Sequence, residues 1–129
     1  MTREEAIRLY ADAVRLDLSG AELLRDPEAV QRDCNGIGAE WMGEFLRGLV
    51  TKLNPSLKPV AAIHDRRYVI NGSSADRKRA DDEFLANGIK SGKQYAWYRP
   101  RRYAVIKNAK RFYAALRMAG YKAWEKHNK

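Results

Sequence analysis

The sequence predicts an all-α protein, and three observations carry that prediction. Apolar residues recur at helical spacing along nearly the whole chain. No segment shows the apolar–polar alternation of a half-buried strand. Residues that cap or break helices stand where the periodic segments begin and end. Because 129 residues suffice for one modest core, we expect a single domain over residues 1–129.

The N-terminal segment predicts a helix with a defined start. Thr2 followed by Glu5 is a capping box, which satisfies backbone N–H groups of the first turn. The apolar stripe expected to meet the core is formed by Ile7, Tyr10, Val14 and Leu18. Because this segment is acidic and amphipathic, it does not have the form of a secretory signal.

Two shorter helices should follow the first. Ser19 with Glu22 repeats the capping pattern. Asp26-Pro27 places a cap residue before a proline at a first helical position, so the second short helix should end near Asp33.

The segment from Cys34 to Gly38 interrupts the helical pattern. Gly36 and Gly38 permit backbone conformations closed to other residues, which lets carbonyl groups turn toward a ligand. A plain helix-breaking turn is the alternative. A helix is expected next over 40–50, and a loop over 53–59.

Three longer helices are expected over residues 60–70, 74–90 and 100–119, followed by a final turn or two over 121–127. Asn71-Gly72 stops the first, Ser73 or Ser74 caps the second, and Pro100 begins the third. Since the turn between the first two is short, we expect these helices to pack antiparallel as neighbours.

The net charge of +9 is concentrated at the C-terminal end of the chain. Residues 1–89 hold 13 Lys/Arg against 15 Asp/Glu, a balance of −2, whereas residues 90–129 hold 12 Lys/Arg against Glu125 alone, a balance of +11. This asymmetry predicts an anionic partner for a basic C-terminal helical segment, either phospholipid headgroups, nucleic acid or an acidic protein. A solvated basic helix face is the alternative.

One cluster of polar side chains carries the chemistry that the sequence suggests. Residues four apart share a helix face, so His64 and Tyr68 project together, while Asp65 is turned by about 100°. Across the short turn, Asp81 can reach His64 or Tyr68. Asp82 competes for that role, and we prefer Asp81 because it shares a face with the apolar Phe84.

This arrangement supports proton transfer beside a hard metal ion. A carboxylate bonded to one imidazole nitrogen fixes the tautomer and leaves the other nitrogen free to take a proton from water. A second carboxylate joined by backbone carbonyl groups offers the oxygen ligands that calcium prefers. With two histidines and the single Cys34, the chain lacks the ligands of a zinc site and cannot form an internal disulfide.

These residues resemble the secreted phospholipase A₂ superfamily. Residues 62–68 look like its His-Asp-x-x-Tyr catalytic helix, and residues 79–84 like the Asp-x-x-Phe helix of its bacterial, fungal and parvoviral members. Residues 34–38 are similar to its Gly-x-Gly calcium loop, although no Tyr-Gly pair opens the loop here. The chain is most similar to small phospholipase A₂-like proteins encoded in phages and prophages, which implies their fold of two antiparallel catalytic helices without disulfides.

The resemblance implies a calcium-dependent hydrolase of phospholipid esters. It makes His64 the general base, Asp81 the carboxylate that orients it, and Tyr68 the phenol that buttresses this carboxylate. The calcium ligands that it implies are Asp65 and the backbone carbonyl groups of Cys34, Gly36 and Gly38.

Partners and location follow from the rest of the chain. Residues 95–103 mix aromatic residues with arginines, which suits docking on an anionic membrane surface. Two other hypotheses stay open: a non-catalytic phage-associated protein that contacts particle proteins, and a nucleic-acid-binding module that stacks bases on Tyr95, Trp97 and Tyr98. Without a signal peptide or a transmembrane stretch, we expect the protein in the cytoplasm where it is made, virion-associated, or delivered by another route.

Overall fold

The computed structural model describes residues 1–34, 53–70, 72–121 and 124, and within them every regular element is helical. The elements are α1 (Arg3–Arg15), the 3-10 helix η1 (Ala21–Leu24), α2 (Pro27–Asp33), the 3-10 helix η3 (Pro55–Leu57), α4 (Lys58–Ile70), α5 (Ser74–Gly92) and α6 (Pro100–Ala119). The all-α prediction is therefore confirmed for the described chain. The helix expected over 40–50, and with it Gly36 and Gly38, lies outside the described residues.

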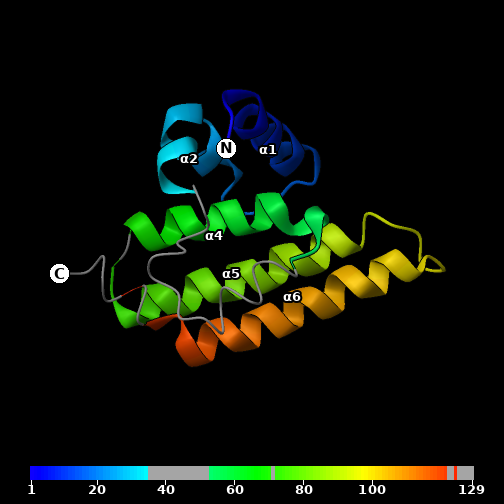
Figure 1. The fold of residues 1–129 in the computed structure, drawn as a ribbon. Coiled ribbons are helices and arrows are strands. Elements are labelled where there is room, and N and C mark those ends of the chain that lie inside the picture. Colours follow the sequence, from blue (N-terminus) through cyan, green and yellow to red (C-terminus); the bar gives the residue numbers. More distant parts are fainter. Residues whose placement is uncertain (35–52, 71, 122–123, 125–129) are drawn as a thin grey trace.

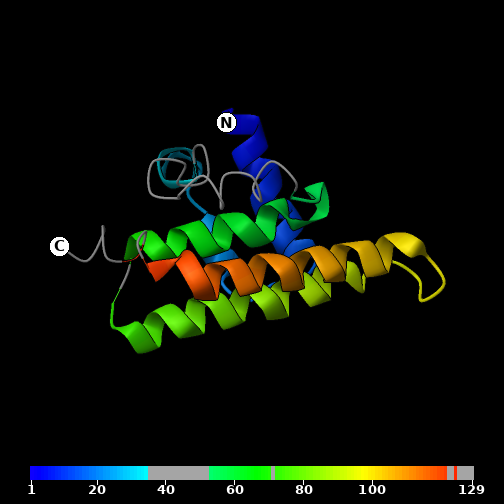
Figure 2. The ribbon, with the colours of Figure 1, turned by 60° about the horizontal axis from the view of Figure 1, so that its bottom comes forward.

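Three long helices, α4, α5 and α6, run side by side in alternating directions (Figure 1). They remain neighbours when the molecule is turned by 60° (Figure 2). α1 and α2 pack against α4 on the side away from α6 (Figure 1). α4 therefore lies between the N-terminal helices and the other two long helices, and it is the helix that carries the candidate site.

The helix ends are set by the capping residues that the sequence indicates. Oδ1 of Asp26 accepts the backbone N–H of Glu28 at 3.0 Å. At the start of α5, Ser73 and Asp76 cap each other: the serine hydroxyl accepts the Asp76 N–H at 3.2 Å, and Oδ2 of Asp76 accepts the Ser73 N–H at 2.9 Å. Pro100 occupies the first turn of α6, as expected.

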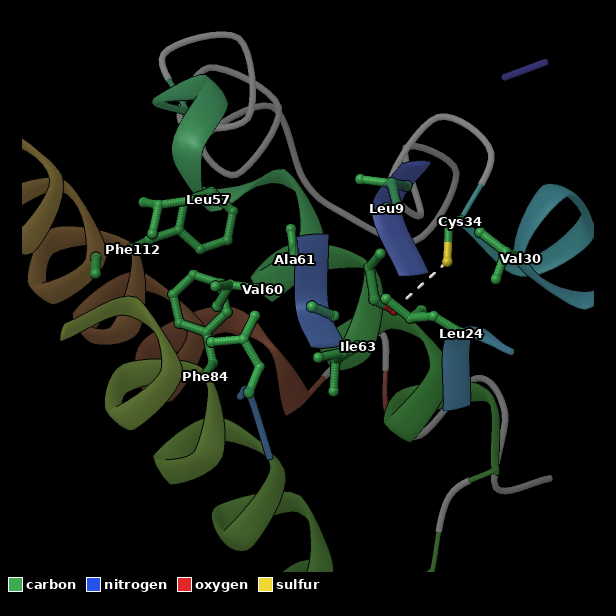
Figure 3. Packing of buried hydrophobic residues seen from close by; sticks show 14 of the residues in the cluster. Leu9, Leu24, Val30, Cys34, Leu57, Val60, Ala61, Ile63, Phe84 and Phe112 are labelled. Carbon is green, nitrogen blue, oxygen red and sulfur yellow. Dashed lines mark hydrogen bonds between the residues drawn. The ribbon is translucent and has the colours of Figure 1, made fainter. Parts of the chain in front are cut away.

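The main core lies between α4 and its neighbours on both sides (Figure 3). On the α5–α6 side, the stacked rings of Phe84 and Phe112 lie 5.3 Å apart between centroids. The largest fully buried apolar side chains are Leu24, Val30, Leu57, Val60, Ile63, Phe84, Val105 and Leu116. The segment of α4 next to His64 is thus fixed by apolar packing on both flanks.

The predicted N-terminal apolar stripe is confirmed in part, since Leu18 is buried in the core and Tyr10 packs against it. Ala6, Leu9 and Ala13 are buried, whereas Ile7 and Val14 are 48% and 54% exposed. Small side chains allow two helices to approach closely, and the alanines at positions 6 and 13 provide such a contact surface. The local apolar pattern does not reveal this, because the choice of face depends on the helix opposite.

Two other expectations are corrected. Ser19 does not cap η1: its N–H donates to Oδ1 of Asn87 at 2.9 Å and its hydroxyl to Oε2 of Glu83 at 2.8 Å, so it joins the N-terminal segment to α5. The segment over 53–59 is not simply a loop, since it contains η3 and the start of α4. Prolines are tolerated in such first turns, where the missing N–H would have no helical partner.

Gly88 lies at a close approach of α5 to α6. A Cβ atom added there would lie 2.5 Å from Cβ of Ala109. We expect Gly88→Ala to lower the free energy of unfolding by about 1–3 kcal/mol, although alanine is the better helix former. Urea unfolding measures the loss, and adding Ala109→Gly should recover part of it. An unchanged unfolding midpoint in Gly88→Ala would contradict the close packing.

Candidate active site

A buried histidine–aspartate pair joins α4 to α5. Nε2 of His64 lies 2.8 Å from Oδ1 of Asp81, and both side chains are almost fully removed from solvent. The contact predicted between these two residues is therefore confirmed. Asp82 instead lies at the surface, bonded to Lys78 at 2.7 Å and to Tyr113 at 2.7 Å.

Tyr68 completes this buried group from the next turn of α4. Its hydroxyl donates to Oδ1 of Asp81 at 2.8 Å, and its ring centroid lies 4.3 Å from that of His64. Phe84 meets the imidazole edge-on at 5.4 Å, and Trp124 meets the Tyr68 ring edge-on at 5.0 Å. The imidazole is thus held by one hydrogen bond and by aromatic rings.

Two arginines that were not expected from the sequence also lie beside Asp81. Nη1 of Arg117, from α6, donates to Oδ2 of Asp81 at 2.7 Å. Nη2 of Arg77 lies 3.9 Å from the same oxygen and donates to the backbone carbonyl of Leu116 at 2.8 Å. Oδ1 of Asp81 thus accepts hydrogen bonds from His64 and Tyr68, and Oδ2 accepts one from Arg117. These contacts fix the orientation of the carboxylate.

These contacts determine the charge state of the buried group. Burial alone raises the pKa of Asp81, but hydrogen bonds from His64, Tyr68 and Arg117 outweigh burial and hold this pKa below its usual value. Burial, together with the charge of Asp81, raises the pKa of the Tyr68 phenol. At neutral pH, Asp81 is therefore an anion and Tyr68 a neutral donor.

The ionised state of Asp81 fixes the tautomer of His64. A carboxylate only accepts hydrogen bonds, so Nε2 carries the proton in this contact. Nδ1 of neutral His64 then holds a lone pair, and no described residue hydrogen-bonds it. This nitrogen is the group in the cluster that is able to take a proton from water.

Asp65 has an environment opposite to that of Asp81. It is 4% exposed, and its Oδ2 has no hydrogen-bond partner among the described residues. Burial first, and then the nearby charge of Asp33, raises the pKa of Asp65 well above its usual value. Asp33 is itself bonded by Arg32 and Arg66, so these cations are engaged elsewhere. Burying a carboxyl group without a partner lowers the stability of the fold, and binding of a cation is one way to offset that loss.

Asp65 and Cys34 line a pocket of about 450 Å³ between α1 and the start of α4. The apolar residues around this pocket are Met1, Leu9, Leu53, Pro55, Pro59, Ala61 and Ala62. The charged residues are Glu5, Arg8, Asp12, Lys58 and Asp65. The volume falls in the range of small-molecule sites, and an apolar lining with a few charges suits an amphiphilic ligand.

Cys34 is buried beside Asp65 and has no features of a nucleophile. Its thiol donates to the carbonyl of Ala62 at 3.4 Å, and burial together with the charges of Asp65 and Asp33 raises the pKa of the thiol. The dashed line in Figure 3 marks the contact with Ala62. A metal would need further oxygen ligands, because the described residues include no group of three or more His, Cys, Asp or Glu side chains placed to hold a metal ion.

The orphaned Oδ2 of Asp65 nevertheless fits one position in the oxygen shell of a hard cation. Backbone carbonyl groups would have to supply the remaining protein ligands. Of the residues expected to do so, Cys34 lies next to Asp65, while Gly36 and Gly38 fall outside the described residues.

No protein family, curated protein or solved structure matches this chain. Within the described residues, no helix has the length and apolarity needed to cross a membrane. Function is therefore inferred from the residues of the site itself.

Proposed function

We propose that this protein is a phospholipase A₂-like hydrolase of phospholipid esters, with His64 as the general base. The observation that carries the proposal is the contrast between two buried carboxyl groups, one hydrogen-bonded to His64 and the other on the residue that follows it. Asp81 is saturated with donors and orients the imidazole, whereas Asp65, the next residue after His64, is buried with an oxygen that lacks a partner among the described residues. Carboxylates in contrasting environments are typical of separate roles in one site.

The proton transfer follows from the tautomer of His64. Nδ1 takes a proton from a water molecule as the water oxygen bonds to the carbonyl carbon of the ester. Asp81 stabilises the imidazolium that forms, and Tyr68 and Arg117 keep the carboxylate in place. When the tetrahedral intermediate collapses, the ester C–O bond breaks and the imidazolium returns its proton to the departing alcohol oxygen.

Calcium is the cofactor of this proposal, with Asp65 and the backbone carbonyl groups of Cys34, Gly36 and Gly38 as its protein ligands. When bound, calcium supplies positive charge that polarises the ester carbonyl and stabilises the oxyanion. Asp65 is suited to this role because its Oδ2 has no partner among the described residues, while Arg32 and Arg66 are bonded to Asp33.

The pocket beside Asp65 agrees with an ester that carries a fatty chain. Its apolar lining includes Leu9 from α1 and Pro59 and Ala62 from α4, which provides a surface for methylene groups. The charged residues at the same pocket, including Arg8 and Lys58, provide polar contacts for the rest of the molecule.

Replacing Asp65 with asparagine tests both the cofactor and the site. At neutral pH we expect Asp65→Asn to raise the free energy of unfolding by about 1 kcal/mol or more, since an unpartnered buried carboxylate is removed. The folded-state pKa of Asp65 is raised, so the cost of this group grows as pH rises above the unfolded pKa, and the gain should vanish in acid. The variant should also lose hydrolysis and the calcium-induced rise in melting temperature.

The matched control is Asp33→Asn, in the same region. Because Asp33 is bonded by Arg32 and Arg66, its replacement should destabilise the fold. Phospholipid hydrolysis is measured with calcium and again with a chelator, beside thermal unfolding under both conditions. A wild-type protein that shows neither turnover nor a calcium response would contradict the proposal and favour a non-catalytic protein of the same fold.

A further inference from the structure

The connection between α5 and α6, together with the first turn of α6, exposes three large aromatic side chains. Trp97 is 73% exposed, Tyr98 63% and Tyr103 56%. With Arg99 and Arg101, which are also exposed, they form a surface that we call the aromatic tip. Contiguous apolar surface of this kind on a soluble domain marks an interaction site.

Hydrogen bonds hold the aromatic tip in this exposed arrangement. The hydroxyl of Tyr103 donates to the backbone carbonyl of Trp97 at 2.6 Å, which ties the connection to the first turn of α6. The Arg99 N–H donates to the carbonyl of Ala96 at 2.9 Å. The rings of Trp97 and Tyr98 meet edge-on at 5.7 Å. Exposure of these rings is therefore part of the folded structure.

Positive charge accompanies the aromatic rings. The guanidinium of Arg99 lies 5.6 Å from the ring centroid of Tyr98, and that of Arg101 lies 5.6 Å from the ring of Tyr95. Lys107, Lys110 and Arg111 continue the exposed basic surface along α6. Because residues 90–121 contain no Asp or Glu, no acidic residue of this segment offsets the charge.

The connection between α5 and α6, which carries Trp97, Tyr98 and Arg99, projects at one end of the molecule in both views (Figures 1 and 2). Hydrogen bonds with η3 connect this end of the molecule to the pocket. The hydroxyls of Tyr95 and Ser56 lie 2.8 Å apart, and Ser91 donates to the carbonyl of Ser56 at 2.8 Å. Pro55 and Lys58, on either side of this contact, line the pocket that contains Asp65.

We propose that the aromatic tip docks the protein on the surface of an anionic phospholipid bilayer. Tryptophan and tyrosine favour the headgroup layer, where the ring is buried and its polar group stays hydrated. Adjacent arginines are attracted to anionic lipid. A projecting end suits insertion into a flat surface. This inference rests on the proposed function, since docking would bring the pocket near its phospholipid substrate. Binding to the bilayer can nevertheless be measured without turnover.

Vesicle co-sedimentation in the presence of a chelator tests docking without hydrolysis. The probes are vesicles of phosphatidylcholine alone and of phosphatidylcholine mixed equally with phosphatidylglycerol. Trp97→Ala/Tyr98→Ala should reduce partitioning onto the anionic vesicles by at least about tenfold. The matched control, Met118→Ala/Tyr121→Ala, removes two large exposed side chains at and just beyond the C-terminal end of α6 and should bind like the wild type.

A second pair of variants tests the charge. Arg99→Gln/Arg101→Gln should weaken binding to the anionic vesicles by about fivefold for each charge removed, with a smaller effect at high salt. The control Arg3→Gln/Arg25→Gln removes the same net charge at two exposed positions of the N-terminal region, and it should change binding little.

The outcomes separate this inference from the proposed hydrolysis. If the protein shows no turnover but binds vesicles through the aromatic tip, the docking surface is supported and only the proposed hydrolase function is contradicted. Hydrolysis of a short-chain phospholipid without vesicle binding overturns the docking surface alone. Equal loss in the tip variants and their controls also overturns it, as does a wild type that binds duplex DNA but not vesicles.

Discussion

Replacing His64 with glutamine is expected to lower phospholipid hydrolysis by about 10³-fold while the chain stays folded. The glutamine amide retains a donor for Asp81 but has no lone pair able to take a proton from water at neutral pH. Loss of the ring contacts with Tyr68 and Phe84 should lower the free energy of unfolding by about 1–2 kcal/mol. Circular dichroism and urea unfolding establish that the fold is kept, and release of fatty acid measures the activity.

The control is His127→Gln, which replaces the other histidine of the sequence and should leave hydrolysis unchanged. The calcium-induced rise in melting temperature should survive in His64→Gln, because Asp65 is still present. That result would separate the proposed proton-transfer role of His64 from the proposed metal-binding role of Asp65. A folded His64→Gln protein that hydrolyses phospholipid at the wild-type rate would contradict the assignment of the general base.

Several helix starts could be predicted from the sequence because they depend on short-range chemistry. Asp26, Ser73 and Pro100 each act within a few residues of their own position, and the structure places them at helix starts. The buried face of α1 was not accessible in the same way. Its contact surface depends on η1, α2 and α4, which pack against it; Ala6 and Ala13 are buried and the larger Ile7 and Val14 are exposed.

The same distinction applies to the candidate site. The contact between His64 and Asp81 could be predicted because a short turn between α4 and α5 constrains which residues meet. Arg117 could not, since residues 93–99 separate α5 from α6 and leave the alignment of these helices undetermined by sequence spacing. The proximity of Gly36 and Gly38 to Asp65 remains a prediction.

Asp81→Asn is expected to destabilise the protein more than any other single change considered. Asp81 is fully buried and accepts hydrogen bonds from His64, Tyr68 and Arg117. An asparagine keeps one acceptor but turns an amide donor toward another donor. It also leaves the Arg117 guanidinium without its anionic partner. Breaking such a buried pair lowers the free energy of unfolding by about 3–5 kcal/mol. Because Arg117 is partly exposed, we expect a loss of about 3 kcal/mol.

The next residue provides the control for Asp81→Asn. Asp82 is paired with Lys78 at the surface, so Asp82→Asn should cost less than about 1 kcal/mol. Adding Arg117→Met to Asp81→Asn should recover part of the loss by removing the unpaired cation. Similar unfolding midpoints for the two single variants would show that the contacts around Asp81 contribute little to stability.

Acid should remove the stabilisation that Asp81 provides. Its folded-state pKa lies below the unfolded value, so the stabilising contribution of this carboxylate is present above the unfolded pKa and is lost as pH falls through the folded pKa. The difference in unfolding free energy between wild type and Asp81→Asn should therefore be largest near neutral pH and shrink in strong acid. Urea unfolding across that range measures it. A difference independent of pH would mean that shape, and not the charge of Asp81, holds His64, Tyr68 and Arg117 together.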